Sequence, residues 1–149
     1  MSRTFKMIAI PIAFSGEGEF DEVEYGKLAL REEDVRFFFP TSEDAEVVKV
    51  GVEDDMFSCV DKDKLLQQVN NSRFMTVPID IGADQEKMVP LYLDPGYITR
   101  IYIMQNEPEN TYFQIHGVDI TFDTPTPVED LVHMIAQKTG GEDDGEKVG

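Results

Sequence analysis

The segment Leu91–Met104, "LYLDPGYITRIYIM", decides the fold because an earlier segment, Leu28–Pro40, "LALREEDVRFFFP", has the same pattern. When Leu28 is aligned with Leu91, each segment reads as an apolar stretch, a short polar link and a second apolar stretch. Self-similarity of this kind is the sequence signature of a repeated supersecondary unit. The two segments therefore predict that the chain contains two copies of one unit.

The similarity extends through both halves. Aligning Pro11 with Pro78 matches the apolar segment Met7–Phe14 to Arg73–Ile81. Each copy then reads as strand, turn, strand, short link, strand, turn, strand, turn, strand and helix. Identity between the copies is low, so chance similarity of two β-rich stretches is the alternative to an old gene duplication.

Each copy ends in a helical pattern, and the second is the clearer one. Thr126 is the expected N-cap, Pro127 the first helical position and Glu129 the partner in a capping box. In the first copy Asp61 or Asp63 can cap the shorter segment "DKDKLLQQVNN". The apolar face of the second helix is expected to comprise Val128, Leu131, Val132 and Ile135.

We therefore predict an α+β protein, mostly antiparallel β, formed by tandem duplication of a small β-rich module that ends in a short helix. The expected units are residues 1–71, residues 72–140 and a flexible acidic tail over residues 141–149, which is highly charged and has no apolar periodicity. Prolines in strands favour sheet edges. Pro11 and Pro78 therefore predict that the first strand of each copy is an edge strand.

The strongest global signal is the charge, because thirty acidic residues against thirteen basic ones give −17. Such a chain repels nucleic acid and anionic membranes, and it can attract a basic protein surface. The alternative is that acidity only keeps the protein soluble. No apolar run reaches the roughly 18 residues of a membrane helix. We expect no direct binding of nucleic acid and no membrane association.

The apolar segment Met7–Phe14 follows two basic residues, as a signal peptide would. It is short, contains Pro11 and lacks a convincing cleavage site. Its counterpart, Arg73–Ile81, lies in the middle of the chain. We therefore read it as a strand of the mature protein and expect a cytoplasmic protein or one assembled into a virion, not export by a signal peptide.

No reaction can be assigned from the sequence. His116, His133 and Cys59 lack the spacing of a metal site. The glycines at Gly16 and Gly18 alternate with glutamates, which repel phosphate. We expect no catalytic residue, metal or cofactor, and we predict that the protein is not an enzyme. A small-ligand site in a cleft between the halves is a further alternative.

The best candidates for function are apolar strand residues. In "RFFFP", Phe37 and Phe39 share one face of a strand and Phe38 takes the other, so both faces are apolar. In the second copy the same two-sided character comes from Ile98, Ile101, Tyr102 and Ile103. Such strands are either buried between the two halves or form an interface for another protein chain. The candidate interface consists of Phe37, Phe38, Phe39, Ile101 and Tyr102.

Two functions follow from these features. The first is a non-enzymatic structural or assembly protein that self-associates or binds a protein partner. By analogy of type, small acidic β-rich proteins occur among phage virion components such as capsid decoration or head-completion proteins. The second is an acidic inhibitor that mimics nucleic acid and blocks a basic nucleic-acid-binding protein. Its candidate surface consists of Glu19, Asp21, Glu22, Glu24, Glu53, Asp54 and Asp55.

Overall fold

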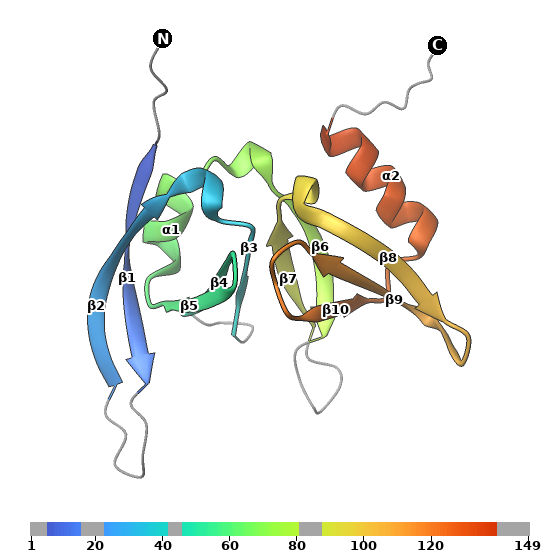
Figure 1. Cartoon of the computed structure of the whole chain (residues 1–149), viewed down its shortest axis with the longest axis horizontal. Helices are drawn as coiled ribbons and strands as arrows, with labels where there is room; N and C mark the ends of the chain where they lie inside the picture. The colour runs from blue at the N-terminus through green and yellow to red at the C-terminus, as the bar shows by residue number, and fades with distance from the viewer. Residues whose placement is uncertain (1–5, 16–22, 42–45, 81–87, 140–149) are drawn as a thin grey trace.

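The computed structural model describes residues 6–15, 23–41, 46–80 and 88–139. Antiparallel strands form a seven-stranded and a three-stranded sheet, and two α-helices accompany them. The predicted class, mostly antiparallel β with short helices, is confirmed. The first half lies on the left of Figure 1 and the second half on the right.

The elements of the two halves follow one another in the same order. Those of the first half are β1 (Met7–Ser15), β2 (Val23–Arg31), the 3₁₀ helix η1 (Glu32–Asp34), β3 (Phe37–Pro40), β4 (Val48–Val52), β5 (Asp55–Cys59) and α1 (Lys62–Gln68). A 3₁₀ turn, η2 (Asn71–Arg73), links the halves. Those of the second half are β6 (Met75–Asp80), β7 (Met88–Leu93), η3 (Pro95–Tyr97), β8 (Ile98–Met104), β9 (Glu107–Ile115), β10 (Thr121–Thr124) and α2 (Val128–Thr139).

One strand pair joins the halves within the large sheet, whose order is β2-β1-β5-β4-β3-β7-β6. In this pair, β3 lies antiparallel to β7, with Phe37 opposite Leu93 and Phe38 opposite Tyr92. The other sheet has the order β10-β9-β8. The large sheet therefore runs across the position where the sequence suggests a boundary between two repeats.

The first hairpin of each half has the same register. Ile8 lies opposite Leu30 in the β1–β2 hairpin, and Met75 lies opposite Leu93 in the β6–β7 hairpin. The sequence alignment of the halves matches Ile8 with Met75 and Leu30 with Leu93. Register is fixed by which residues face the core, so both hairpins present equivalent residues inward.

The predicted edge position is confirmed for β6, the last strand of the large sheet, and is wrong for β1. β1 lies between β2 and β5, although its pairing with β5 covers only Ile12 and Ala13. Pro11 lies just outside that short pairing, and its carbonyl accepts a hydrogen bond from the Val60 N–H at 3.0 Å. Farther along β1, the Gln68 side chain of α1 replaces a strand neighbour, because it accepts from the Ala9 N–H at 2.9 Å and donates to the Ala9 carbonyl at 2.8 Å.

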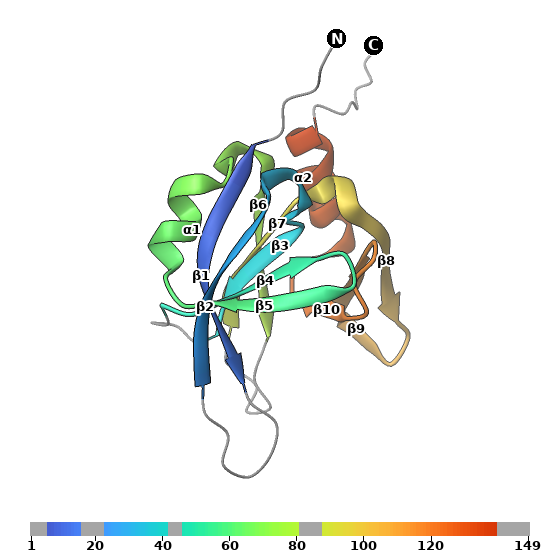
Figure 2. The same cartoon turned by 60° about the vertical axis from the view of Figure 1, so that its left-hand side comes forward.

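The helices form near their expected positions. Asp61 caps α1 by accepting a hydrogen bond from the Lys64 N–H at 3.2 Å. At the start of α2, the Leu131 N–H donates a helical hydrogen bond to the Pro127 carbonyl at 2.9 Å. Views from two directions place α1 over the first half and α2 over the second (Figures 1 and 2).

Each half has its own apolar core, and each core includes an aromatic residue from the other half. Phe74 of the second half belongs to the first cluster, and Phe37 of the first half belongs to the second cluster. Neighbouring side chains on a strand point to opposite faces. β3 therefore supplies Phe38 to the first core and Phe37 to the second, and it lies between them.

Two carboxylates mark the place where the sheets separate in the second half. In the first half Ala13 of β1 pairs with Ser58 of β5. The corresponding strands β6 and β10 lie side by side but form no ladder. Burial raises the pKa of Asp123 on β10, and the nearby charges of Asp80 on β6 and of Glu107 raise it further. Like charges facing each other across strands destabilise their pairing.

We expect Gly51→Ala to destabilise the fold. A methyl group at Gly51 would overlap the buried ring of Phe37. Overpacking of this kind costs about 1–3 kcal/mol, which urea unfolding can measure. Gly96→Ala is the control, because the added carbon would meet only a carboxylate oxygen of Asp94 at 3.3 Å. Equal losses in the two variants would contradict the packing described for β3.

We expect Asp123→Asn to stabilise the protein at pH 7. The folded state raises the pKa of Asp123, so ionisation of this carboxyl opposes folding above the ordinary pKa. The gain should disappear as the pH falls through the raised folded pKa, because the wild-type carboxyl is then protonated. Urea midpoints between pH 3 and pH 8 measure this, with the exposed Asp119→Asn as the control. A gain independent of pH would exclude the electrostatic cause.

Candidate functional site at the junction of the halves

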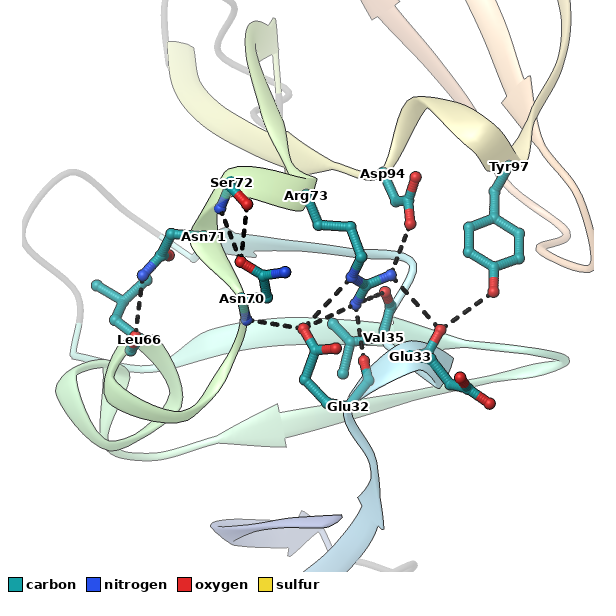
Figure 3. Close-up of polar contacts among 10 residues, drawn as sticks. All are labelled: Glu32, Glu33, Val35, Leu66, Asn70, Asn71, Ser72, Arg73, Asp94 and Tyr97. Atoms are coloured by element: carbon teal, nitrogen blue, oxygen red, sulfur yellow. Dashed lines mark hydrogen bonds and ion pairs between the residues drawn. The ribbon is translucent and has the colours of Figure 1, made fainter. Parts of the chain in front are cut away.

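Arg73 joins the two halves beside the β3–β7 pair (Figure 3). Its guanidinium lies 3.2 Å from a carboxylate oxygen of Glu32 in the first half and 2.6 Å from one of Asp94 in the second. It also donates to the backbone carbonyl of Val35 at 2.9 Å. The planar fork of arginine suits such multiple acceptors, so one side chain fixes β7 and η1 relative to each other.

Local structure aims Arg73 at this position. The Asn70 side chain accepts from the Ser72 N–H at 3.3 Å, which closes the η2 turn immediately before Arg73. The buried carboxylate of Glu32 accepts a further bond from the Asn70 N–H at 2.8 Å. Across the junction, the Tyr97 hydroxyl donates to the Glu33 carbonyl at 3.1 Å. Buried charge is tolerated here because it is hydrogen-bonded.

A second arginine supports the other side of the junction. Arg36 is buried, its guanidinium lies 4.3 Å from the centroid of the Tyr97 ring, and it donates to the His116 carbonyl. It also lies 3.6 Å from the carboxylate of Glu53. The Arg36 carbonyl accepts from the Asp94 N–H at 2.9 Å. Arg36 thus connects β3 to η3 and to the end of β9.

The structure buries two of the five candidate interface residues within the chain. Phe37 and Phe38 have exposed fractions of 0% and 1%. Phe38 stacks on Tyr92 with ring centroids 4.9 Å apart and meets Phe74 edge-on at 5.1 Å. Phe39 is half-buried and packs against the second core. Phe37 and Phe38 are therefore buried between the two halves, which was the alternative to an interface with another protein chain.

The other two candidates lie on β8, on opposite faces. Ile101 is half-buried against the second core, and Tyr102 stacks on Tyr112 of β9 with ring centroids 5.6 Å apart. The sequence places Ile103 in the same two-sided apolar pattern, on the face of Ile101, and the structure leaves it 50% exposed. Sequence reasoning missed Met104, which is 47% exposed at the end of the same strand.

An apolar hollow of about 330 Å³ lies beside β8, against α2. The sequence predicts Val132 on the buried face of the helix, yet Val132 is 50% exposed and only Leu131 of α2 is fully buried. Part of the apolar face of α2, including Val132, is therefore not packed against the rest of the described chain. The hollow is lined by Pro95, Ile98, Thr99, Arg100, Ile101, Val132 and Ile135.

The candidate acidic surface is only partly described. Glu19, Asp21 and Glu22 lie outside the described residues, as does the tail over residues 141–149, while Glu24 lies in β2. The other three, Glu53, Asp54 and Asp55, are exposed at the β4–β5 turn. Asp54 has a positive φ of 65°, and its N–H donates to the Gly117 carbonyl at 2.7 Å. Asp54 and Asp55 line a hollow of about 370 Å³ with Asp119.

Few titratable groups gather in the described part of the chain. No cluster of three or more His, Cys, Asp or Glu side chains suited to a metal ion occurs among residues 6–15, 23–41, 46–80 and 88–139. His116 and His133 are exposed, and burial raises the pKa of the Cys59 thiol. None of the helices that the structure describes is long and apolar enough to cross a membrane.

Comparison with known proteins finds no matching family model, curated protein or solved structure.

We expect Arg73→Met to destabilise the chain by about 3–5 kcal/mol, because the buried carboxylate of Glu32 and the half-buried carboxylate of Asp94 would lose their shared partner. Urea unfolding monitored by circular dichroism measures the loss. Arg31→Lys is the control, because the Arg31–Glu33 pair is exposed and such pairs contribute less than about 1 kcal/mol. Equal, small effects of the two substitutions would show that Arg73 does not hold the junction.

Proposed function

We propose that the chain is a non-enzymatic assembly protein that works through contacts with other protein chains. The observation that carries this proposal is the β8 strand with its exposed Ile103 and Met104 and the apolar hollow beside it. Within the described residues, β8 pairs with β9 alone. An edge strand with unpaired backbone groups and apolar side chains is a template for another chain.

We also propose that the chain arose by tandem duplication of one β-rich module. The repeated element order and the equivalent register of the first hairpins support this origin. Duplication favours an assembly function, since a module that already binds a copy of itself within one chain has a surface suited to binding further copies. A small acidic chain of this type fits a decoration or head-completion role in a phage virion.

The second candidate function is an acidic inhibitor of a basic nucleic-acid-binding protein. Its supporting observation is that Glu53, Asp54 and Asp55 lie together on one exposed turn, near Asp119. Exposed charge pairs are screened by salt, so binding of this kind weakens as salt increases. Apolar contacts between acidic copies behave in the opposite way, because salt screens their mutual repulsion.

The solution mass by light scattering on a sizing column tests the proposed function. We expect an assembly larger than one chain whose mass is maintained or increases between about 0.05 M and 1 M NaCl, where the screening length falls to about 3 Å. Ile103→Lys should reduce the mass towards one chain, because a lysine on an edge strand opposes pairing. Ile120→Lys is the control, since Ile120 is also exposed but lies away from β8.

One chain at both salt concentrations would contradict the proposed function. An assembly that dissociates at high salt would show that electrostatic contacts, and not the apolar residues of β8, hold it together. Equal effects of Ile103→Lys and Ile120→Lys would remove β8 from the contact.

A further inference from the structure

The strands that join the two halves have counterparts at the two ends of the molecule. The alignment of the halves matches β3 with β8 and β2 with β7. In the part of the chain that the structure describes, β8 pairs only with β9 and β2 pairs only with β1. Figure 1 shows them at opposite sides of the molecule. The β3–β7 junction is therefore formed by copies of the two strands that lie open elsewhere.

The first core is closed by residues from the outer face of the second half. Phe74 and Tyr92 both contact Phe38, with ring centroids 5.1 Å and 4.9 Å apart. Phe74 also belongs to the same apolar cluster as Val35 and Val69. Two aromatic side chains of the β6–β7 hairpin thus cover the side of the first core formed by η1, β3 and the end of α1.

The equivalent side of the second core is not covered by any described residue. The alignment matches Val35 with Ile98 and Phe38 with Ile101, and both counterparts line the apolar hollow. α2 lines the hollow with Ile135, as the end of α1 borders the first core at Val69. The hollow is therefore the counterpart of the space that Phe74 fills in the first half.

The residues that could fill this hollow lie on the outer face of the β1–β2 hairpin. The alignment matches Phe74 with Met7 and Tyr92 with Ala29. Met7 is 57% exposed, and Ala29 is exposed as well. Both are apolar, so the outer face of the first hairpin has the character needed to cover an apolar surface.

We infer that a second copy of this chain binds at β8, so that the β1–β2 hairpin of one copy closes the second core of another. This inference rests on the proposed function and names its partner. Strand β2 lies antiparallel to β8 in the register of the internal junction, with Ala29 opposite Ile101 and Leu30 opposite Arg100. Met7 enters the hollow beside α2.

This contact is head-to-tail, because it joins two different surfaces. Repetition of a heterologous contact gives a closed ring when the rotation closes and an open filament when it does not. A two-fold dimer would instead join identical surfaces. The geometry therefore predicts assemblies in which every copy uses β8 towards one neighbour and β2 towards the other.

The proposed contact between chains lacks the ion pairs that Arg73 forms at the internal junction. The alignment matches Arg73 with Lys6, while Glu32 and Asp94 correspond to Pro95 and Arg31. Neither of the two carboxylates that bind Arg73 has an acidic counterpart in the alignment. The chains also repel each other, because each has a net charge of −17. Association therefore depends on strand pairing and apolar burial, is reversible, and becomes stronger as salt screens the repulsion.

Mixing two single-cysteine variants tests the register. Chains with Ala29→Cys are mixed with chains with Ile101→Cys at high salt and oxidised, and the products are separated without reductant. We expect mixed disulfide dimers, because directly opposed residues of antiparallel strands lie within disulfide reach. Each variant alone should give few dimers. The native Cys59 is buried, and oxidised wild-type protein measures its contribution.

A third variant, Thr121→Cys, supplies the matched control. Thr121 is exposed on β10, at the other edge of the same small sheet, so mixing it with Ala29→Cys should give at least tenfold fewer mixed dimers. Circular dichroism and thermal melting establish that each variant folds. Where Ile101→Cys does not fold, Arg100→Cys with Leu30→Cys tests the adjacent pair of the same register.

The outcomes separate this inference from the proposed function. Assemblies that form at high salt without mixed disulfides would overturn the β2–β8 contact and leave the proposed function standing. Abundant dimers from either variant alone would indicate a two-fold contact and would also overturn it. A single chain at every salt concentration would overturn both.

Discussion

The fold depends on the pairing of β3 with β7 and on the residues that surround it. Phe38 packs against Phe74 and Tyr92 of the second half. Phe37, its neighbour on the strand, lies in the second core. Arg73 adds a guanidinium shared by a carboxylate from each half. Apolar burial on both faces and a buried ionic bridge at one end hold two small cores together as one molecule.

Much of this fold could be predicted from local pattern. The alternation of apolar residues and the turn residues predicted the strands, and Asp61 caps helix α1 as expected. The edge position of β1 was predicted wrongly, because Pro11 shows only that one donor is missing and not how far the neighbouring strand extends. The division of the sheets between β6 and β10 was not predicted, because the alternation of a strand does not show which neighbour it pairs with.

The candidate site was harder to predict, because exposure depends on what the rest of the chain covers. Phe37 and Phe38 belong to a run of three phenylalanines, yet the chain buries both. The apolar residues that stay exposed, such as Ile103 and Val132, have no local signal that separates them from core residues. In the part of the chain that the structure describes, Phe74 of the second half covers the first core, whereas a hollow beside β8 borders the second core.

Hydrogen exchange measured at low and high protein concentration tests the central claim most directly, because amides of paired strands exchange slowly. We expect the amides of β8 and β2 to become protected together as concentration rises at high salt, while those of β10 stay unchanged. Protection that does not change with concentration, or that appears in β10 instead of β8 and β2, would contradict the claim that the open strands repeat the internal junction.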